Sequence, residues 1–147
     1  MRTTGKFLPV LAILALLSPA TARGEKSFGS VRVEAVTSVY DGDSFRVNIS
    51  GWPPIIGRRI PIRVAGVDTP EMKGRCPREK ELARQAKRFV VAALRGAKVI
   101  ELRNLRRGKY FRIVADVILD GESLAPMLIA KGLGVPYNGG RKTRPWC

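Results

Sequence analysis

The stretch I-P-I-R-V-A-G-V-D-T-P-E, residues 60–71, most constrains what this chain can fold into. Its first half is an apolar run of strand length, which predicts a buried β-strand. One arginine, Arg63, interrupts the run, and two carboxylates, Asp68 and Glu71, follow in the turn after it. Because arginine is rarely buried without a partner, we expect Arg63 to face an anion. That anion is either a carboxylate in a structural ion pair or a bound phosphate.

A second acidic turn, Y-D-G-D-S-F, carries Asp41 and Asp43 one strand earlier in the chain. If the two turns adjoin, carboxylates roughly 4–5 Å apart repel by about 4 kcal/mol per pair at an effective dielectric near 20. A proton or an arginine could offset this repulsion, but a divalent cation would do so best. Because every available ligand is a hard oxygen, we predict a site for calcium, magnesium or manganese rather than for zinc or copper.

Each acidic turn also has an ordinary structural explanation. Asp-Gly is a common hairpin turn, and D-T-P-E fits a turn that begins a helix with Asp68 as its cap. The metal hypothesis therefore rests on the joint occurrence of the two turns after consecutive strands, with Arg63 on the strand that leads into one of them.

The hydrophobic pattern predicts a mainly β protein with helices, of the α+β class. Alternation with a period of two indicates strands, and a period of 3.6 indicates helices. We expect strands at 30–40, 45–49, 60–67, 98–105 and 112–119, a loop at 51–59, a long helix at 77–96 and a short helix at 124–131 capped by Ser123. In the first strand, the odd-numbered residues are expected to share one face. Helices after the third and fifth strands favour a five-stranded Greek-key barrel of the OB type.

The length of 147 residues favours one domain. Residues 1–22 have the positive start, apolar core and A-T-A cleavage pattern of a secretory signal peptide, with an uncleaved membrane anchor as the alternative. We expect a flexible segment at 23–29, the barrel domain at 30–137 and a basic tail at 138–147 that ends in a cysteine. The protein is accordingly predicted to be exported, either to a periplasm or to the medium.

The balance of charges limits the function. The chain has 27 lysines and arginines against 12 acids, a net charge of +15, which favours a polyanionic partner such as nucleic acid or anionic lipid. The absence of histidine excludes Ser-His and Cys-His nucleophiles and histidine-ligated zinc. A membrane-surface protein is less favoured, because the sequence has no second basic amphipathic helix. A metal-dependent enzyme and a non-catalytic nucleic-acid-binding barrel remain, and the acids favour the enzyme because a pure binder has no need of groups that repel phosphate.

Two cysteines in an exported chain suggest a disulfide between Cys76 and Cys147. Such a bond would tie the tail to the loop beside Glu71. Closing a loop of about 71 residues is worth about 4 kcal/mol in the chain-entropy model. The alternative is a pair of unbonded thiols.

Three motifs resemble the thermonuclease family: Y-D-G-D-S, R-V-A-G-V-D-T-P-E, and G-K-Y-F-R at residues 108–112. The similarity covers residues 31–137. It implies an OB-type barrel, dependence on calcium, and hydrolysis of DNA and RNA to products that carry a 3′-phosphate. It implies nucleic acid as the partner and no small-molecule cofactor, and we expect a monomer.

The resemblance also assigns metal ligands by position. Asp43 and Asp68 match the calcium carboxylates, and Thr69 matches the residue that supplies a main-chain carbonyl to the ion. Asp41 is expected in the shell behind them.

The remaining matches concern catalysis and substrate. Arg63 and Arg112 match two catalytic arginines, whose forked donors suit phosphate oxygens in a way that lysine cannot copy. Glu71 matches the proposed general base. Lys109 and Tyr110 match residues that contact the nucleotide phosphate and sugar.

The chain departs from the family pattern in four places. Phe111 stands where glycine is usual, and its bulky ring is expected to re-aim Arg112. Ser44 replaces a threonine, a mild change. The long C-terminal helix of the family is missing. Tyr137 either stacks on a base or packs inside the protein.

Overall fold

The computed structural model describes residues 26–143 and 145–147. The expected signal peptide at 1–22 and the start of the 23–29 segment lie outside these residues. Further along that segment, the backbone N–H of Phe28 donates to the carbonyl of Leu105 at 2.7 Å, and the N–H of Leu105 donates to the carbonyl of Gly29 at 3.0 Å. Among the described residues, no helix is long and apolar enough to cross a membrane.

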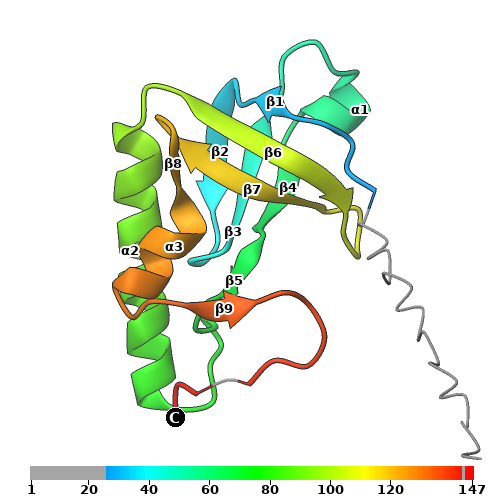
Figure 1. Cartoon of the computed structure of the whole chain (residues 1–147). Helices are drawn as coiled ribbons and strands as arrows, with labels where there is room; N and C mark the ends of the chain where they lie inside the picture. The colour runs from blue at the N-terminus through cyan, green and yellow to red at the C-terminus, as the bar shows by residue number, and fades with distance from the viewer. Residues whose placement is uncertain (1–25, 144) are drawn as a thin grey trace, which may run out of the picture.

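The core of the fold is a curled sheet with two helices on one side (Figure 1). Its strands are β1 (Val31–Arg32), β2 (Ala35–Val39), β3 (Ser44–Asn48), β4 (Ile60–Val64), β6 (Ile100–Arg107), β7 (Ile113–Leu119) and β8 (Glu122–Ser123). The order is β1-β6-β7-β4-β3-β2, with β8 paired to β7, and only the β4–β7 pair is parallel among these described strands. This mixed α+β architecture confirms the predicted fold class.

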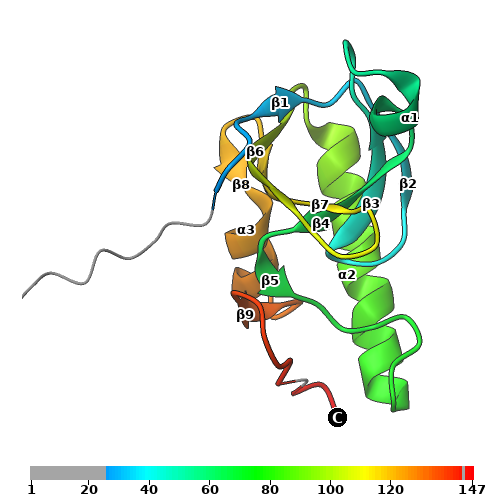
Figure 2. The same cartoon turned by 90° about the vertical axis from the view of Figure 1, so that its right-hand side faces the viewer.

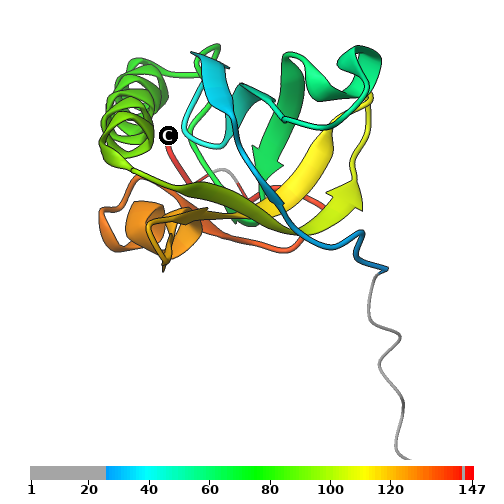
Figure 3. The same cartoon turned by 90° about the horizontal axis from the view of Figure 1, so that it is seen from above.

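The first predicted strand is in fact two strands, and the break closes the sheet. At the bend, Val33 donates to Ile100 of β6 at 2.9 Å, whereas Glu34 donates to Asn48 beside β2 at 2.9 Å. One continuous segment therefore pairs with both edges of the sheet, which curls it (Figure 3). The expected single face was wrong: the bend and a register shift change the phase, so Ala35 is exposed while Val36 packs on the core.

The long helix α2 (Pro77–Gly96) matches its predicted limits. Its inward side is formed by Ala83, Ala86, Val90 and Leu94, which pack on the sheet. The second predicted helix is α3 (Leu124–Ala130), and Ser123 stands at its N-cap without a side-chain cap bond. Ser123 therefore occupies the predicted N-cap position, but its backbone also belongs to β8, which pairs with β7, and its hydroxyl does not cap the helix.

The third predicted strand, 60–67, is divided into β4 and β5 (Gly66–Asp68), and β8 and two further short elements were not predicted. The 51–59 loop contains a one-turn helix, α1 (Pro54–Gly57), which begins with a proline at its first position. The chain after α3 adds a strand, β9 (Val135–Tyr137), which pairs with β5 (Gly66–Asp68) below the curled sheet (Figure 2). The β5–β9 pair fixes the turn that carries Asp68 and brings the tail beside it.

Gly42, which lies between Asp41 and Asp43, lets helix α2 approach this turn. A Cβ at Gly42 would lie 2.8 Å from Cβ of Ala86 on α2 and 2.8 Å from Cγ2 of Thr69. Only glycine fits so close a contact. The turn after β2, the turn after β5 and α2 therefore meet at Gly42.

Candidate active site

A cavity of about 490 Å³ opens where the predicted site residues meet. Its walls come from the turn between β2 and β3, from β4, from the loop after β5, from the start of β7 and from the tail after β9. The predicted residues that line it are Asp41, Asp43, Arg63, Glu71 and Arg112. Asp68 and Thr69 do not line the cavity; they are buried behind it.

Arg63 is buried on β4 and holds the two acidic turns together. It contacts Oδ1 of Asp43, and its Nη2 lies 3.0 Å from Oδ1 of Asp68 and 3.3 Å from the carbonyl of Val67. The β4 register places Arg63 opposite Ser44, next to Asp43. The structural ion pair considered from the sequence therefore exists, while the same side chain lines the cavity. Removing one partner of such a buried pair is costly because it strands a charge.

Asp43 is the link between the turns. Its Oδ2 accepts a hydrogen bond from the backbone N–H of Thr69 at 2.9 Å, and its Oδ1 accepts one from the hydroxyl of Ser44 at 3.0 Å. Ser44 therefore supplies to Asp43 the hydroxyl that the expected threonine would supply. The backbone N–H of Asp43 in turn donates to Oδ1 of Asp41 at 3.1 Å. The two acidic turns therefore adjoin.

Burial perturbs the carboxyl of Asp41. Burial and, to a smaller extent, repulsion from Glu71 raise its pKa from 3.8 to about 6, although Arg63 and hydrogen bonds with Ser44 act in the opposite direction. The carboxyl of Asp41 is therefore harder to ionise in the folded protein than in the unfolded chain.

Lys142 is a cation of the site that sequence reasoning missed. Its Nζ lies 2.7 Å from Oδ1 of Asp68 and 2.7 Å from Oε1 of Glu71. Burial lowers the pKa of this amine, but the hydrogen bonds to both acids outweigh that effect and raise it. A signal was available: a tail that returns to Cys76 must pass Glu71, so a basic residue before Cys147 is brought to the acids.

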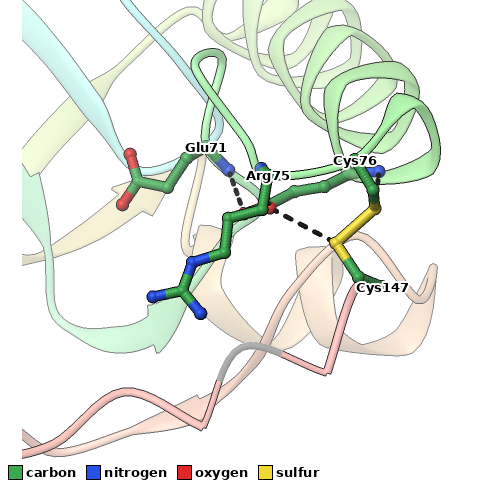
Figure 4. The surroundings of a disulfide bond; sticks show 5 residues. Glu71, Arg75, Cys76 and Cys147 are labelled. Atoms are coloured by element: carbon green, nitrogen blue, oxygen red, sulfur yellow. Dashed lines mark hydrogen bonds between the residues drawn. A yellow bond between two sulfur atoms is a disulfide. The ribbon is translucent and has the colours of Figure 1, made fainter.

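The expected disulfide between Cys76 and Cys147 is present (Figure 4). Beside it, the buried carboxylate of Glu79 accepts hydrogen bonds from the backbone N–H groups of Arg75 at 2.7 Å and Glu71 at 3.4 Å. A Cβ at Gly74 would lie 2.5 Å from Cγ of Glu79, so the loop wraps this side chain closely. Sequence reasoning missed Glu79, whose only signal was an acid in the first turn of the helix.

The tail also supplies an aromatic ring. The Tyr137 ring centroid lies 5.9 Å from Cζ of Arg63, and the hydroxyl donates to the carbonyl of Gly140 at 2.9 Å. The ring lines the cavity and also packs on the arginine. The position of Tyr137 is therefore compatible with both roles considered from the sequence, stacking on a base and packing inside the protein.

The remaining predicted residues lie in the segment that follows β6, and only one of them lines the cavity. Arg112 reaches the cavity, and its Nε is buried without a hydrogen-bond partner. Lys109 and Tyr110 are exposed and do not line the cavity. Phe111 also stays outside the cavity, so its ring does not displace Arg112 from the cavity wall.

The donor set fits a hard cation, although the acids are now paired with basic side chains. In residues 26–143 and 145–147, no three acids or cysteines are gathered closely enough to hold a metal ion. The carboxylates of Asp43 and Asp68 are buried and turned toward Arg63, and the hydroxyl of Thr69 is buried without a partner. Two carboxylates and uncommitted oxygen nearby are ligands that calcium accepts, so an ion would replace cations already present.

Comparisons with known proteins agree with these observations. The family described as "Staphylococcal nuclease homologue" matches residues 61–144. A probable endonuclease of Penicillium rubens is 31% identical, with 70% of this chain and 39% of that protein covered. A probable endonuclease of Schizosaccharomyces pombe is 30% identical, with 71% of this chain and 55% of that protein covered. The chain thus spans less than two thirds of either relative, but the family match covers more than half of the chain itself. The chain belongs to the staphylococcal nuclease family.

Proposed function

We propose that this protein is an exported, calcium-dependent nuclease that hydrolyses phosphodiester bonds of DNA and RNA. The observation that carries the proposal is the cavity in which Arg63, Glu71 and Arg112 converge from three separate segments beside the buried acids. The names of the two relatives, both probable endonucleases, support it. Export rests on the pattern of residues 1–22 and on the disulfide.

The two arginines have the role of binding the scissile phosphate. Arg112 has a buried Nε with no partner, so a phosphate oxygen would satisfy it. Arg63 presents a forked donor at the cavity wall while its carboxylate partners hold it in place. Such donors stabilise the negative charge that develops on the phosphoryl oxygens as the bond breaks. A calcium ion bound by Asp43, Asp68 and the carbonyl of Thr69 would polarise the phosphate as a Lewis acid.

Glu71 has the role of accepting a proton from the attacking water. Its carboxylate lines the cavity, and Lys142 holds one of its oxygens at 2.7 Å. Its backbone is held by Glu79, which is covered by the disulfide loop. The tail therefore positions the base.

The proposal is tested by incubating the purified protein with single-stranded DNA and RNA in calcium, magnesium, manganese or chelator, and then identifying the product ends. We expect cleavage with calcium, none with chelator, and 3′-phosphate ends. Cleavage that persists in chelator would refute the metal requirement.

The same assay separates the enzyme from a non-catalytic barrel. Binding of nucleic acid without any cleavage, under every metal tested, would favour the binding protein. The match of acids and arginines in one cavity favours cleavage, because the acids weaken simple binding of a polyanion.

A further inference from the structure

A second groove, of about 390 Å³, adjoins the catalytic cavity at Arg112, which lines both. Its walls come from the segment before β1, from α1 and from the turn between β6 and β7. The aromatic and apolar residues that matter are Phe28, Trp52, Ile56 and Phe111. The volume lies in the range of roughly 300–1,000 Å³ that is typical of ligand sites.

The chemistry of this groove differs from that of the cavity. Phe28 is 68% exposed and Phe111 is 73% exposed, so two large rings face solvent. Arg106, Arg107 and Arg112 stand around them, and no acid is among the described residues that line the groove. Rings interleaved with arginines are the arrangement that binds unpaired bases by stacking and their phosphates by charge.

The backbone holds Phe111 outward at a cost. Tyr110 and Phe111 adopt φ values of 57° and 58°, a left-handed conformation that bulky residues rarely take. Each such residue typically costs about 1–3 kcal/mol. The turn is closed by a hydrogen bond from the N–H of Gly108 to the carbonyl of Arg112 at 2.7 Å. A strained turn that exposes a large ring to solvent indicates a role for that ring outside the barrel.

We propose that the groove binds the bases of single-stranded nucleic acid next to the phosphate in the catalytic cavity. This inference rests on the proposed function. The strand passes Arg112, its next bases stack on Phe111 and Phe28, and its phosphates meet Arg107. Bases in a duplex are already stacked and paired, so the groove selects single strands.

The test measures binding of a labelled single-stranded oligonucleotide of about ten nucleotides in chelator, by fluorescence anisotropy. Stacking on one ring contributes roughly 1–3 kcal/mol, so Phe28→Ala and Phe111→Ala should each weaken binding about 5- to 100-fold. Binding of a duplex of the same length should change less than twofold. The control is Ile55→Ala, since Ile55 is 84% exposed but does not line the groove.

Phe28 makes the test independent of the catalytic turn, because it lies far from Arg112 in the sequence. Unchanged affinity in Phe28→Ala and Phe111→Ala, both confirmed as folded by thermal unfolding, would overturn the inference and leave the groove to another occupant. Equal weakening of duplex and single strand would also overturn it. If the wild type binds but restored calcium yields no cleavage, the proposed function fails while the groove stands.

Discussion

The catalytic cavity and the neighbouring groove meet at Arg112 but treat charge in opposite ways. In the cavity, Arg63 and Lys142 are bound to buried carboxylates. In the groove, arginines stand beside exposed rings with no acid among the described lining residues. Under the proposed function, the cavity must exchange these partners to bind metal and phosphate, whereas the groove would accept a strand without such an exchange. We therefore expect cleavage and strand binding to be separable by mutation.

The largest expected effect breaks the cavity while leaving the groove intact. Arg63→Ala and Glu71→Gln should each lower kcat by about 10²–10³, because each removes a group that acts on the reacting phosphate or water. Oligonucleotide affinity measured in chelator should change much less. Arg95→Ala and Glu122→Gln remove the same charges from exposed positions and serve as controls. Full activity of either cavity variant would refute the role assigned to that residue.

The second effect concerns the disulfide that ties the tail to the loop beside Glu71. Reduction of the Cys76–Cys147 bond should lower the free energy of unfolding by about 4 kcal/mol, because the 71-residue separation adds chain entropy to the unfolded state. The loosened tail carries Lys142, so cleavage should slow as well, whereas binding in the groove should not change. Chemical denaturation with and without reductant measures this. An unfolding midpoint that does not change when reductant is added would contradict the predicted loss of stability.

The third effect tests the burial of Asp41. Because the pKa of Asp41 in the folded protein lies above 3.8, at about 6, the folded state holds the proton more tightly than the unfolded chain. This contribution to stability is full below the ordinary pKa and is lost as pH rises through 6. In chelator, Asp41→Asn should remove the loss and be more stable than wild type by about 3 kcal/mol at pH 7.

Denaturation at several pH values measures the Asp41 effect. The difference between wild type and variant should shrink toward acid pH. A constant difference across the whole range would show that Asp41 does not titrate in this window.

The smallest expected effect tests whether Lys142 and a metal ion compete for the same acids in the cavity. Lys142 competes with metal for Asp68 and Glu71. Lys142→Gln should therefore bind calcium about tenfold more tightly, which corresponds to about 1.4 kcal/mol, although the metal-free protein is less stable. Titration calorimetry measures the affinity. Arg141→Gln removes a neighbouring exposed charge and should leave the calcium affinity unchanged. An equal change of affinity in both variants would show that Lys142 acts only through its contribution to the net charge and not through competition for the acids.

The sequence predicted those parts of the fold that depend on local periodicity. The apolar stripe that begins after Pro77, together with Pro77 for the first turn and Gly96 for the stop, located α2. The bend at Val33 and Glu34 was missed because it depends on which edges the strand pairs with, and those partners are distant in the chain. The α1 turn and β9 are too short to show a period.

In the candidate site, too, the sequence predicted the residues that have a local signal and missed those that depend on distant contacts. Asp43, Arg63 and Glu71 stand out because acids and an arginine flank an apolar strand, and they lie in one region of the structure. Lys142 and Glu79 carry no such local signal, since each matters only after the disulfide brings the tail back.

The most direct test of the central claim is a calcium titration of the wild type beside Asp68→Asn. We expect the wild type to bind one calcium ion that displaces the cations now paired with Asp68, and we expect Asp68→Asn to lose this binding together with cleavage of single-stranded DNA. Equal calcium binding by both proteins, or undiminished cleavage by Asp68→Asn, would contradict it.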